Sequence, residues 1–251
     1  MKNQSYKSML SAICLWAMVA ASVAYAQQPT TLTGPQILAQ VKTNYAQCQS
    51  YMDAGSVETV FITERGRRTV LKPFTTAFVR PEAFRFEFQA RRGEAEWNRY
   101  IVWQQGAAIK SLWTLNLQER EFTDLGQALA GPTGVSGGSA VLVPGLLLPN
   151  AVRGGLLKAL TNVTLAGEET VDARAAYKLE AQDIRGQALT LWIDKTHLVI
   201  LKLYQKQKID PAKLPGGKGA PFETETTTTF SPKLNEPVPA ARLEFLAFAV
   251  K

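Results

Sequence analysis

The spacing of hydrophobic residues changes near residue 50. Before that point, apolar residues recur at the three- and four-residue intervals of an amphipathic helix: Ile37, Leu38, Val41 and Tyr45. Thr33-Gly34-Pro35 precedes them; proline is tolerated in a first helical turn, and Thr33 or Gly34 can cap the helix. We therefore predict one helix that ends near Cys48 to Ser50.

From Tyr51 onward, hydrophobic and polar residues alternate with the period of β-strands that have one buried face. The clearest case is Phe84-Arg85-Phe86-Glu87-Phe88. Short turn signals such as Gln105-Gly106 and Asp194-Lys195 separate the alternating stretches, and turns this short cannot hold a parallel crossover. We predict about ten antiparallel strands, the last at Thr224 to Phe230 and Leu243 to Phe248.

The segment from Gly131 to Leu160 interrupts this alternation. It is strongly apolar, but Pro144, Gly145 and Pro149 prevent one continuous helix. A transmembrane helix needs about 20 apolar residues without such breaks. We expect short helical pieces that lie on the sheet as a lid, with these residues facing it: Leu142, Leu146, Leu147 and Leu148. A permanently buried connection that fills the core is the alternative.

The amino terminus has the pattern of an export signal. Lys2 and Lys7 precede an apolar run from Met9 to Val23, and Ala24-Tyr25-Ala26 fits a small-x-small cleavage site. We expect cleavage after Ala26, which gives a signal peptide (1–26), a single domain (27–251) and a periplasmic location. Only Cys48 then remains, so no internal disulfide can form.

The chain is moderately basic, with a formal net charge of +7. Such a charge favours anionic lipid head groups but falls short of a nucleic-acid footprint, so no nucleic-acid partner is expected. Basic residues gather at the predicted hairpin tips, where they are either solvated edges or a rim for anionic head groups: Arg65, Arg67, Arg68, Lys72, Arg91 and Arg92.

Catalytic constellations are scarce. His197 is the only histidine and lies beside a turn signal, so a His-rich metal site is excluded and a catalytic triad has one candidate base. No Gly-x-Ser-x-Gly elbow or phosphate loop is present, and the carboxylates cluster at turns. We expect no catalytic residue, no metal and no cofactor. A hydrolase that depends on His197 or on a turn carboxylate is the less favoured alternative.

Large aromatic residues are the most informative side chains. An ordinary packed core accounts for many of them. The functional interpretation is that the following residues line a hollow: Phe78, Phe84, Phe86, Phe88, Trp97, Trp103 and Trp113. Phe84, Phe86 and Phe88 are the strongest candidates because their shared face is uninterrupted.

Several short motifs together resemble the LolA-like periplasmic lipoprotein carriers and outer-membrane lipoprotein-sorting proteins. They are Ile37-Leu38-Ala39-Gln40-Val41 running into Gln49-Ser50-Tyr51, Phe78-Val79-Arg80-Pro81 turning into Phe84 to Phe88, the paired hairpins of Gly167 to Leu179 and Leu191 to Lys195, and the ending Thr226 to Phe230 with Pro232 and Asn235. The resemblance covers nearly all of the chain after residue 26.

The resemblance implies a mainly β (α+β) fold, in which a strongly curved antiparallel sheet forms a half-open β-barrel. An N-terminal helix and short helices would cover its apolar hollow, where acyl chains of lipids or lipoproteins bind. It implies a periplasmic binding or carrier protein in envelope trafficking, with membrane-associated envelope proteins as further partners. A non-enzymatic sensor or interaction module of an envelope complex is the alternative, since fold alone does not determine function.

Overall fold

Helix α1 (Gly34–Gln47) begins where the sequence predicts it. The Thr33 backbone N–H donates to Gln36 Oε1 at 2.8 Å, which is one half of a capping box. The helix buries the predicted apolar stripe against the sheet. The computed structural model describes residues 32–91, 93–213 and 219–245, so the predicted signal peptide lies outside the described residues.

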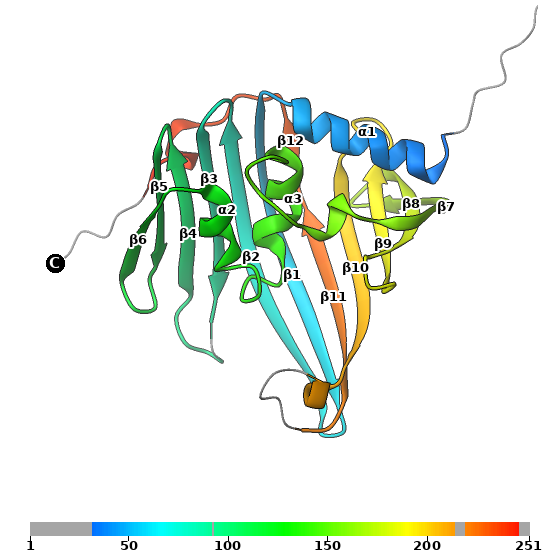
Figure 1. Ribbon diagram of the computed structural model, residues 1–251. Helices are drawn as coiled ribbons and strands as arrows, with labels where there is room; N and C mark the ends of the chain where they lie inside the picture. Colours follow the sequence, from blue (N-terminus) through cyan, green and yellow to red (C-terminus); the bar gives the residue numbers. More distant parts are fainter. Residues whose placement is uncertain (1–31, 92, 214–218, 246–251) are drawn as a thin grey trace, which may run out of the picture. The chain divides into compact units, whose positions relative to one another are not determined.

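The rest of the described chain is dominated by one antiparallel sheet (Figure 1). Its strands are β1 (Ser50–Thr63), β2 (Gly66–Val79), β3 (Ala83–Ala90), β4 (Asn98–Gln105), β5 (Ala108–Trp113), β6 (Gln118–Phe122), β7 (Thr161–Val171), β8 (Arg174–Gln182), β9 (Ala188–Asp194), β10 (Ile200–Ile209), β11 (Phe222–Phe230) and β12 (Lys233–Leu234). The predicted fold class is confirmed: a curved, open, mainly β architecture with few helices.

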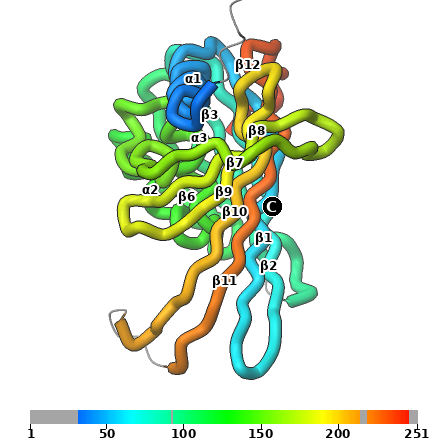
Figure 2. Tube along the Cα trace, turned by 90° about the vertical axis from the view of Figure 1, so that its right-hand side faces the viewer, coloured from blue at the N-terminus to red at the C-terminus, as the bar shows by residue number. Residues whose placement is uncertain are grey.

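The strand order shows how the two halves of the chain join. It runs β6-β5-β4-β3-β2-β1-β11-β10-β9-β8-β7, with β12 added beside β1. The halves meet at the β1–β11 pair, where Gly55 lies opposite Phe230. The path ends at β6 on one side and β7 on the other, so the sheet stays open, and Figure 2 shows the long β1, β2, β10 and β11 extending beyond the rest.

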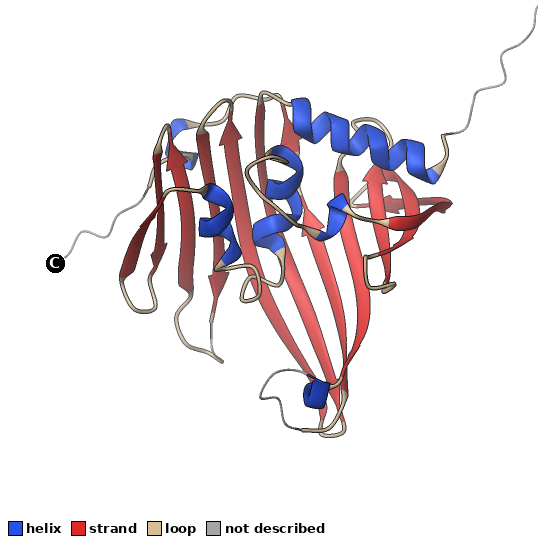
Figure 3. Ribbon diagram, in the orientation of Figure 1, coloured by secondary structure: helices blue, strands red, loops and turns tan. Residues whose placement is uncertain are grey.

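Short helices cover one face of this sheet, as Figure 3 shows. Helix α2 (Leu125–Ala130), helix α3 (Ser139–Leu147) and the 3₁₀ turn η1 (Leu156–Lys158) all come from the connection between β6 and β7. The predicted short helical pieces are therefore present, with Pro144 inside α3. Among the described helices, none is long and apolar enough to cross a membrane.

The carboxyl-terminal part differs from the prediction. The 3₁₀ turns η2 (Pro211–Lys213) and η3 (Ala240–Arg242) flank β11 and β12. The described residues Leu243 to Phe245 follow η3 and form no strand, so the strand predicted there is wrong as far as Phe245; the rest of it lies outside the described residues. The Leu243 carbonyl accepts a hydrogen bond from Trp103 Nε1 at 2.6 Å, which takes the place of strand pairing.

The sheet register assigns each side chain to one of two faces. Phe78 lies opposite Phe84, and Phe74 lies opposite Phe88, so these side chains share the face that α2 and α3 cover. We call this the inner face and the opposite one the outer face. The main apolar core lies between the inner face and the helices.

Candidate functional site

A row of aromatic rings crosses the inner face from β11 to β5. Neighbouring ring centroids lie between 5.4 and 6.3 Å apart, including the step over β1. Such spacings are typical of favourable aromatic pairs. We call this set the aromatic row: Phe230, Phe74, Phe86, Phe88, Tyr100 and Trp113.

Gly55 allows the aromatic row to pass over β1. A Cβ at this position would lie 2.5 Å from the Phe74 ring and 2.3 Å from the Thr229 carbonyl oxygen. Because residue 55 carries no side chain, Phe74 reaches across β1 to pack edge-on against Phe230 at 5.6 Å. The row is therefore continuous across strands that are far apart in the sequence.

The segment 125–158 lies over the aromatic row, and we call it the covering segment. In α3, every residue except Val141 is buried, including the predicted lid residues Leu142, Leu146 and Leu147. Leu148, the fourth predicted lid residue, is half-buried and packs against the same core. The covering segment and the aromatic row form one apolar cluster, so these helices pack directly on the sheet.

The structure brings together most, but not all, of the predicted lining residues. Phe78, Phe84, Phe86 and Phe88 are all buried side by side on the inner face, and Trp113 extends their row through Tyr100. Trp97 lies before β4, where the Arg91 guanidinium stacks over its ring at 4.7 Å. Trp103 is paired with Arg85 and therefore lies on the outer face, away from the covering segment.

Arg80 is the residue that sequence reasoning did not single out. Its guanidinium donates hydrogen bonds to the backbone carbonyls of Ala46, Cys48 and Leu147, the last at 3.0 Å. It thus joins the ends of α1 and α3 to the end of β2, and a cation at helix carboxyl termini is favourable. The Phe-x-Arg-Pro motif contains this arginine and is the signal that identifies it.

A buried carboxyl group lies next to this junction. Asp53 on β1 accepts hydrogen bonds from Tyr51 Oη at 2.7 Å and from the Thr76 backbone N–H at 2.9 Å. Burial raises the pKa of Asp53 to about 6, although the hydrogen bonds from Tyr51 and Thr76 oppose that rise. Tyr45 of α1 packs on Tyr51 at 5.5 Å, so this polar group supports the helix that ends at Arg80.

A pocket opens where the covering segment meets β10 and β11. Its volume is about 310 Å³. Val141, Leu142 and Leu156 form one wall, while β10 and β11 supply the other. The remaining lining residues are Thr133, Gly137, Gly138, Gly155, Asp183, Leu203, Gln205, Gln207 and Thr228. Leu142 of α3 and Leu203 of β10 belong both to this pocket and to the apolar core, so the pocket borders the core.

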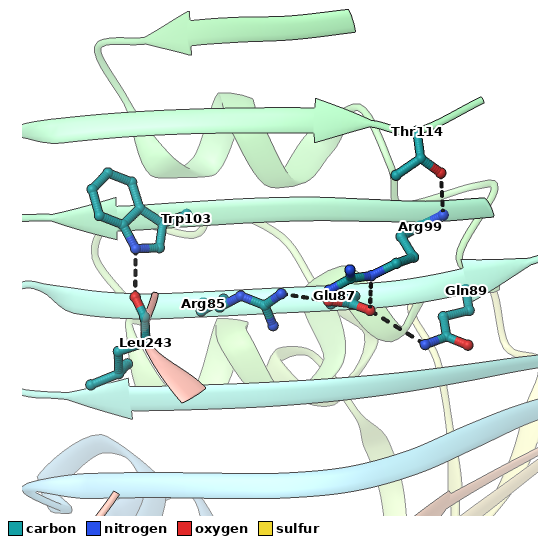
Figure 4. Close-up of polar contacts among 7 residues, drawn as sticks. All are labelled: Arg85, Glu87, Gln89, Arg99, Trp103, Thr114 and Leu243. Carbon is teal, nitrogen blue, oxygen red and sulfur yellow. Dashed lines mark hydrogen bonds and ion pairs between the residues drawn. The ribbon is translucent and has the colours of Figure 1, made fainter. Parts of the chain in front are cut away.

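The outer face carries charge where the inner face carries phenylalanines. Glu87 binds both Arg85 and Arg99, and Figure 4 shows these side chains together with Gln89. Burial alone would raise the pKa of Glu87, but the hydrogen bonds from Arg99 and Arg85 outweigh it and hold that pKa below its usual value. This network accounts for the polar half of the β3 alternation.

The candidate catalytic groups are occupied by structural contacts. Asp194 accepts hydrogen bonds from the Thr196 and His197 backbone N–H groups and forms an ion pair with Arg174 at 2.8 Å. His197 Nδ1 lies 3.1 Å from the same carboxylate, and its side chain is exposed. Within the ranges that the structure describes, no cluster of His, Cys, Asp and Glu is arranged to hold a metal ion.

The fold is that of an open antiparallel sheet whose apolar inner face is covered by short helices. No family model and no curated protein matches the chain. Solved structures of similar fold include the lipoprotein LppX from Mycobacterium tuberculosis, with 15% identity, a TM-score of 0.43, and coverage of 82% of this chain and 98% of that one.

Two further structures bear the class name that the sequence motifs resemble. A LolA superfamily protein from Nitrosomonas europaea has 13% identity and a TM-score of 0.31, covering 86% of this chain and 99% of that one. A putative outer membrane lipoprotein-sorting protein domain from Vibrio parahaemolyticus has 10% identity and a TM-score of 0.35, covering 82% and 94%. These likenesses concern the fold.

Proposed function

We propose that this chain is a non-enzymatic periplasmic carrier that holds the acyl chain of a lipid or lipoprotein between the covering segment and the inner face. The observation that carries the proposal is the composition of the covering segment. Helix α3 presents apolar residues on nearly all sides and packs on the aromatic row. Its backbone is tied to the end of β2 through the Arg80 side chain.

The glycines on both sides of α3 support this role. Gly137 and Gly138 precede α3 with φ values of 69° and 90°, and Gly154 and Gly155 follow it at 80° and 98°. Glycine adopts these values without the strain that other residues meet. Helix α3 can therefore turn about the glycines on both sides while the helix itself stays intact.

The energetics decide how the segment must move. Burying a methylene group contributes about 0.8 kcal/mol, so a tail with about fourteen methylenes gains about 11 kcal/mol. Association itself costs about 4 to 15 kcal/mol, which is of the same order. Little remains for exposing the leucines of α3 to water. We infer that α3 lifts and packs again on the tail, and that it does not swing out into solvent.

A disulfide clamp tests this movement. An ideal Cβ on Gly137 would lie 3.5 Å from the Val57 Cβ, within the range that a disulfide requires. In the double variant Val57→Cys/Gly137→Cys, oxidation should abolish uptake of a fluorescent fatty acid, and reduction should restore it. Native mass spectrometry of the purified protein should show a stoichiometric acyl ligand in the reduced form only.

The single variants Val57→Cys and Gly137→Cys are the matched controls, since each carries the new side chain without the clamp. Undiminished uptake by the oxidised double variant would show that the covering segment is no gate. A protein that takes up no fatty acid in any state would contradict the carrier function and favour an interaction module of an envelope complex.

A further inference from the structure

The inner face changes its chemistry along the strands. Toward α1 it carries the aromatic row, whereas beyond α3 uncharged polar side chains appear among apolar ones in three successive rows across β1, β11 and β10. The first row contains Val57, Thr228 and Leu203; the second Thr59, Thr226 and Gln205; the third Phe61, Thr224 and Gln207. We call the polar members of the second and third rows the polar floor: Thr59, Thr224, Thr226, Gln205 and Gln207.

The pocket beside α3 joins these two regions. Its aliphatic wall comes from Val141, Leu142 and Leu156, and its opposite wall includes Gln205 and Gln207 of the polar floor. A site with one apolar and one hydrogen-bonding wall suits an amphiphile that lies along the strands. Its tail would point toward the core beneath α3, and its head group would rest on the polar floor.

Charge on the walls narrows the class of head group. No lysine or arginine lines the described pocket, and its single charged residue is Asp183. The Asp183 Oδ1 atom accepts hydrogen bonds from the backbone N–H groups of Arg185 and Gln187, so it holds a turn in place. A phosphate here would meet a carboxylate and no cation, and an unpaired buried charge is costly.

Two basic residues of the inner face lie beside these rows on β2, on the side away from the pocket. Lys72 and Arg68 belong to β2, which β1 and β11 separate from the pocket strand β10. The Arg68 guanidinium lies 5.1 Å from the Phe61 ring centroid. Gly137, whose added Cβ would touch Val57, places the loop before α3 between Lys72 and the pocket.

We propose that the carried amphiphile has an uncharged, hydrogen-bonding head group, such as the glycerol of an acylglycerol or a sugar of a glycolipid. This inference rests on the proposed carrier function and adds the class of cargo. The pocket of about 310 Å³ holds about ten groups of water size. That is enough for a glycerol or one sugar ring, while the tail needs the space that α3 occupies.

Two probes with the same tail test the inference. Binding of 1-oleoylglycerol and of 1-oleoylglycerol 3-phosphate is measured by equilibrium dialysis at equal pH and salt, below the concentration at which either forms micelles. The uncharged probe should bind at least tenfold more tightly, because only the phosphate must leave water without a cationic partner.

Variants of the polar floor locate the head group. Thr226→Val keeps the shape but removes the hydroxyl and should weaken 1-oleoylglycerol binding about fivefold, as expected for one hydrogen bond. Thr227→Val, the next residue on the outer face, is the matched control and should leave binding unchanged. Gln207→Lys should strengthen binding of the phosphate probe and so reduce the preference for the uncharged probe.

The outcomes separate the two proposals. Equal or tighter binding of the phosphate probe would overturn the head-group inference and leave the carrier function standing. Equal losses in Thr226→Val and Thr227→Val would overturn the placement on the polar floor. If neither probe binds, the carrier function fails and this inference fails with it.

Discussion

At the scale of single residues, Asp53 links the chemistry of the core to pH. Its carboxyl group is buried and shares hydrogen bonds with Tyr51 and Thr76, and its pKa rises from 3.8 to about 6. Between these two values the folded chain keeps a proton that the unfolded chain has released. The protonated form is therefore the one that the fold favours.

This raised pKa predicts the sign of a pH effect. The contribution of Asp53 is fully present below pH 3.8 and is lost as the pH rises through about 6. The free energy of unfolding should fall by about 3 kcal/mol across this window. Denaturant titrations from pH 4 to 7 should show this fall in the wild type, and it should be absent in Asp53→Asn.

Glu180→Gln, at an exposed position of β8, is the control and should keep the pH dependence of the wild type. An Asp53→Asn variant whose stability still falls between pH 4 and 6 as steeply as the wild type would contradict the assignment to Asp53.

The positions of individual side chains were predictable only where a sequence pattern indicated them. The alternation around Phe84, Phe86 and Phe88 placed these side chains together on one buried face, as the structure confirms. Trp103 is also an aromatic residue in an alternating stretch, but its side chain lies on the outer face. Only the strand register reveals this. Gly55 gave no signal, because its role depends on a ring from the neighbouring strand and on a carbonyl of β11.

At the scale of elements, Arg80 determines how firmly the covering segment is held. Its guanidinium joins the last turns of α1 and α3, so its removal leaves carbonyls at two helix ends without this partner. Arg80→Ala should lower the free energy of opening of α3. Hydrogen exchange in residues 139–147 should then speed up about tenfold or more, which corresponds to about 1.4 kcal/mol.

Arg153→Ala, which removes an exposed arginine after α3, is the matched control and should leave this exchange unchanged. Faster exchange spread evenly over the sheet in Arg80→Ala would indicate a general loss of stability, and the assigned role as a clamp would be wrong.

The elements themselves were largely visible in the sequence. Helix α1 was predicted from Thr33-Gly34-Pro35 and the apolar stripe. The short helices were predicted from the prolines and glycines after residue 131. β6, with the sequence Gln-Glu-Arg-Glu-Phe, was missed because an edge strand with little buried surface lacks a hydrophobic period. The strand predicted from Leu243 failed because its β-forming residues pack on Trp103 without a strand beside them.

At the scale of the whole described unit, the two faces of the sheet divide the tasks. The inner face holds the aromatic row and the pocket, and the outer face holds the Arg85–Glu87–Arg99 network. The spacing of turns in the sequence predicted the curvature and the antiparallel order of the sheet. The turn spacing did not predict the β1–β11 junction, since the partners Gly55 and Phe230 lie far apart in the sequence.

This division predicts that stability and binding can be changed separately. Glu87→Gln leaves two arginines without their carboxylate and should lower the free energy of unfolding by roughly 3 kcal/mol. Uptake of 1-oleoylglycerol, measured well below the unfolding midpoint, should stay at the wild-type level. The matched change Glu121→Gln, at an exposed ion pair with Lys110, should alter neither quantity.

Weakened uptake in folded Glu87→Gln would show that the two faces are coupled through β3. Thermal unfolding monitored by circular dichroism, together with dialysis of the same samples, distinguishes this result from simple loss of folded protein.

For the proposed carrier, the change of chemistry along the strands also predicts the order of steps in cargo transfer. In that carrier, a cargo with its tail beneath α3 would have its head group on the polar floor, beside β10 and β11. A recipient protein would therefore bind the head group while the tail is still shielded from water. Recognition of the head group would then precede release of the tail, and a cargo that the recipient does not recognise would stay bound.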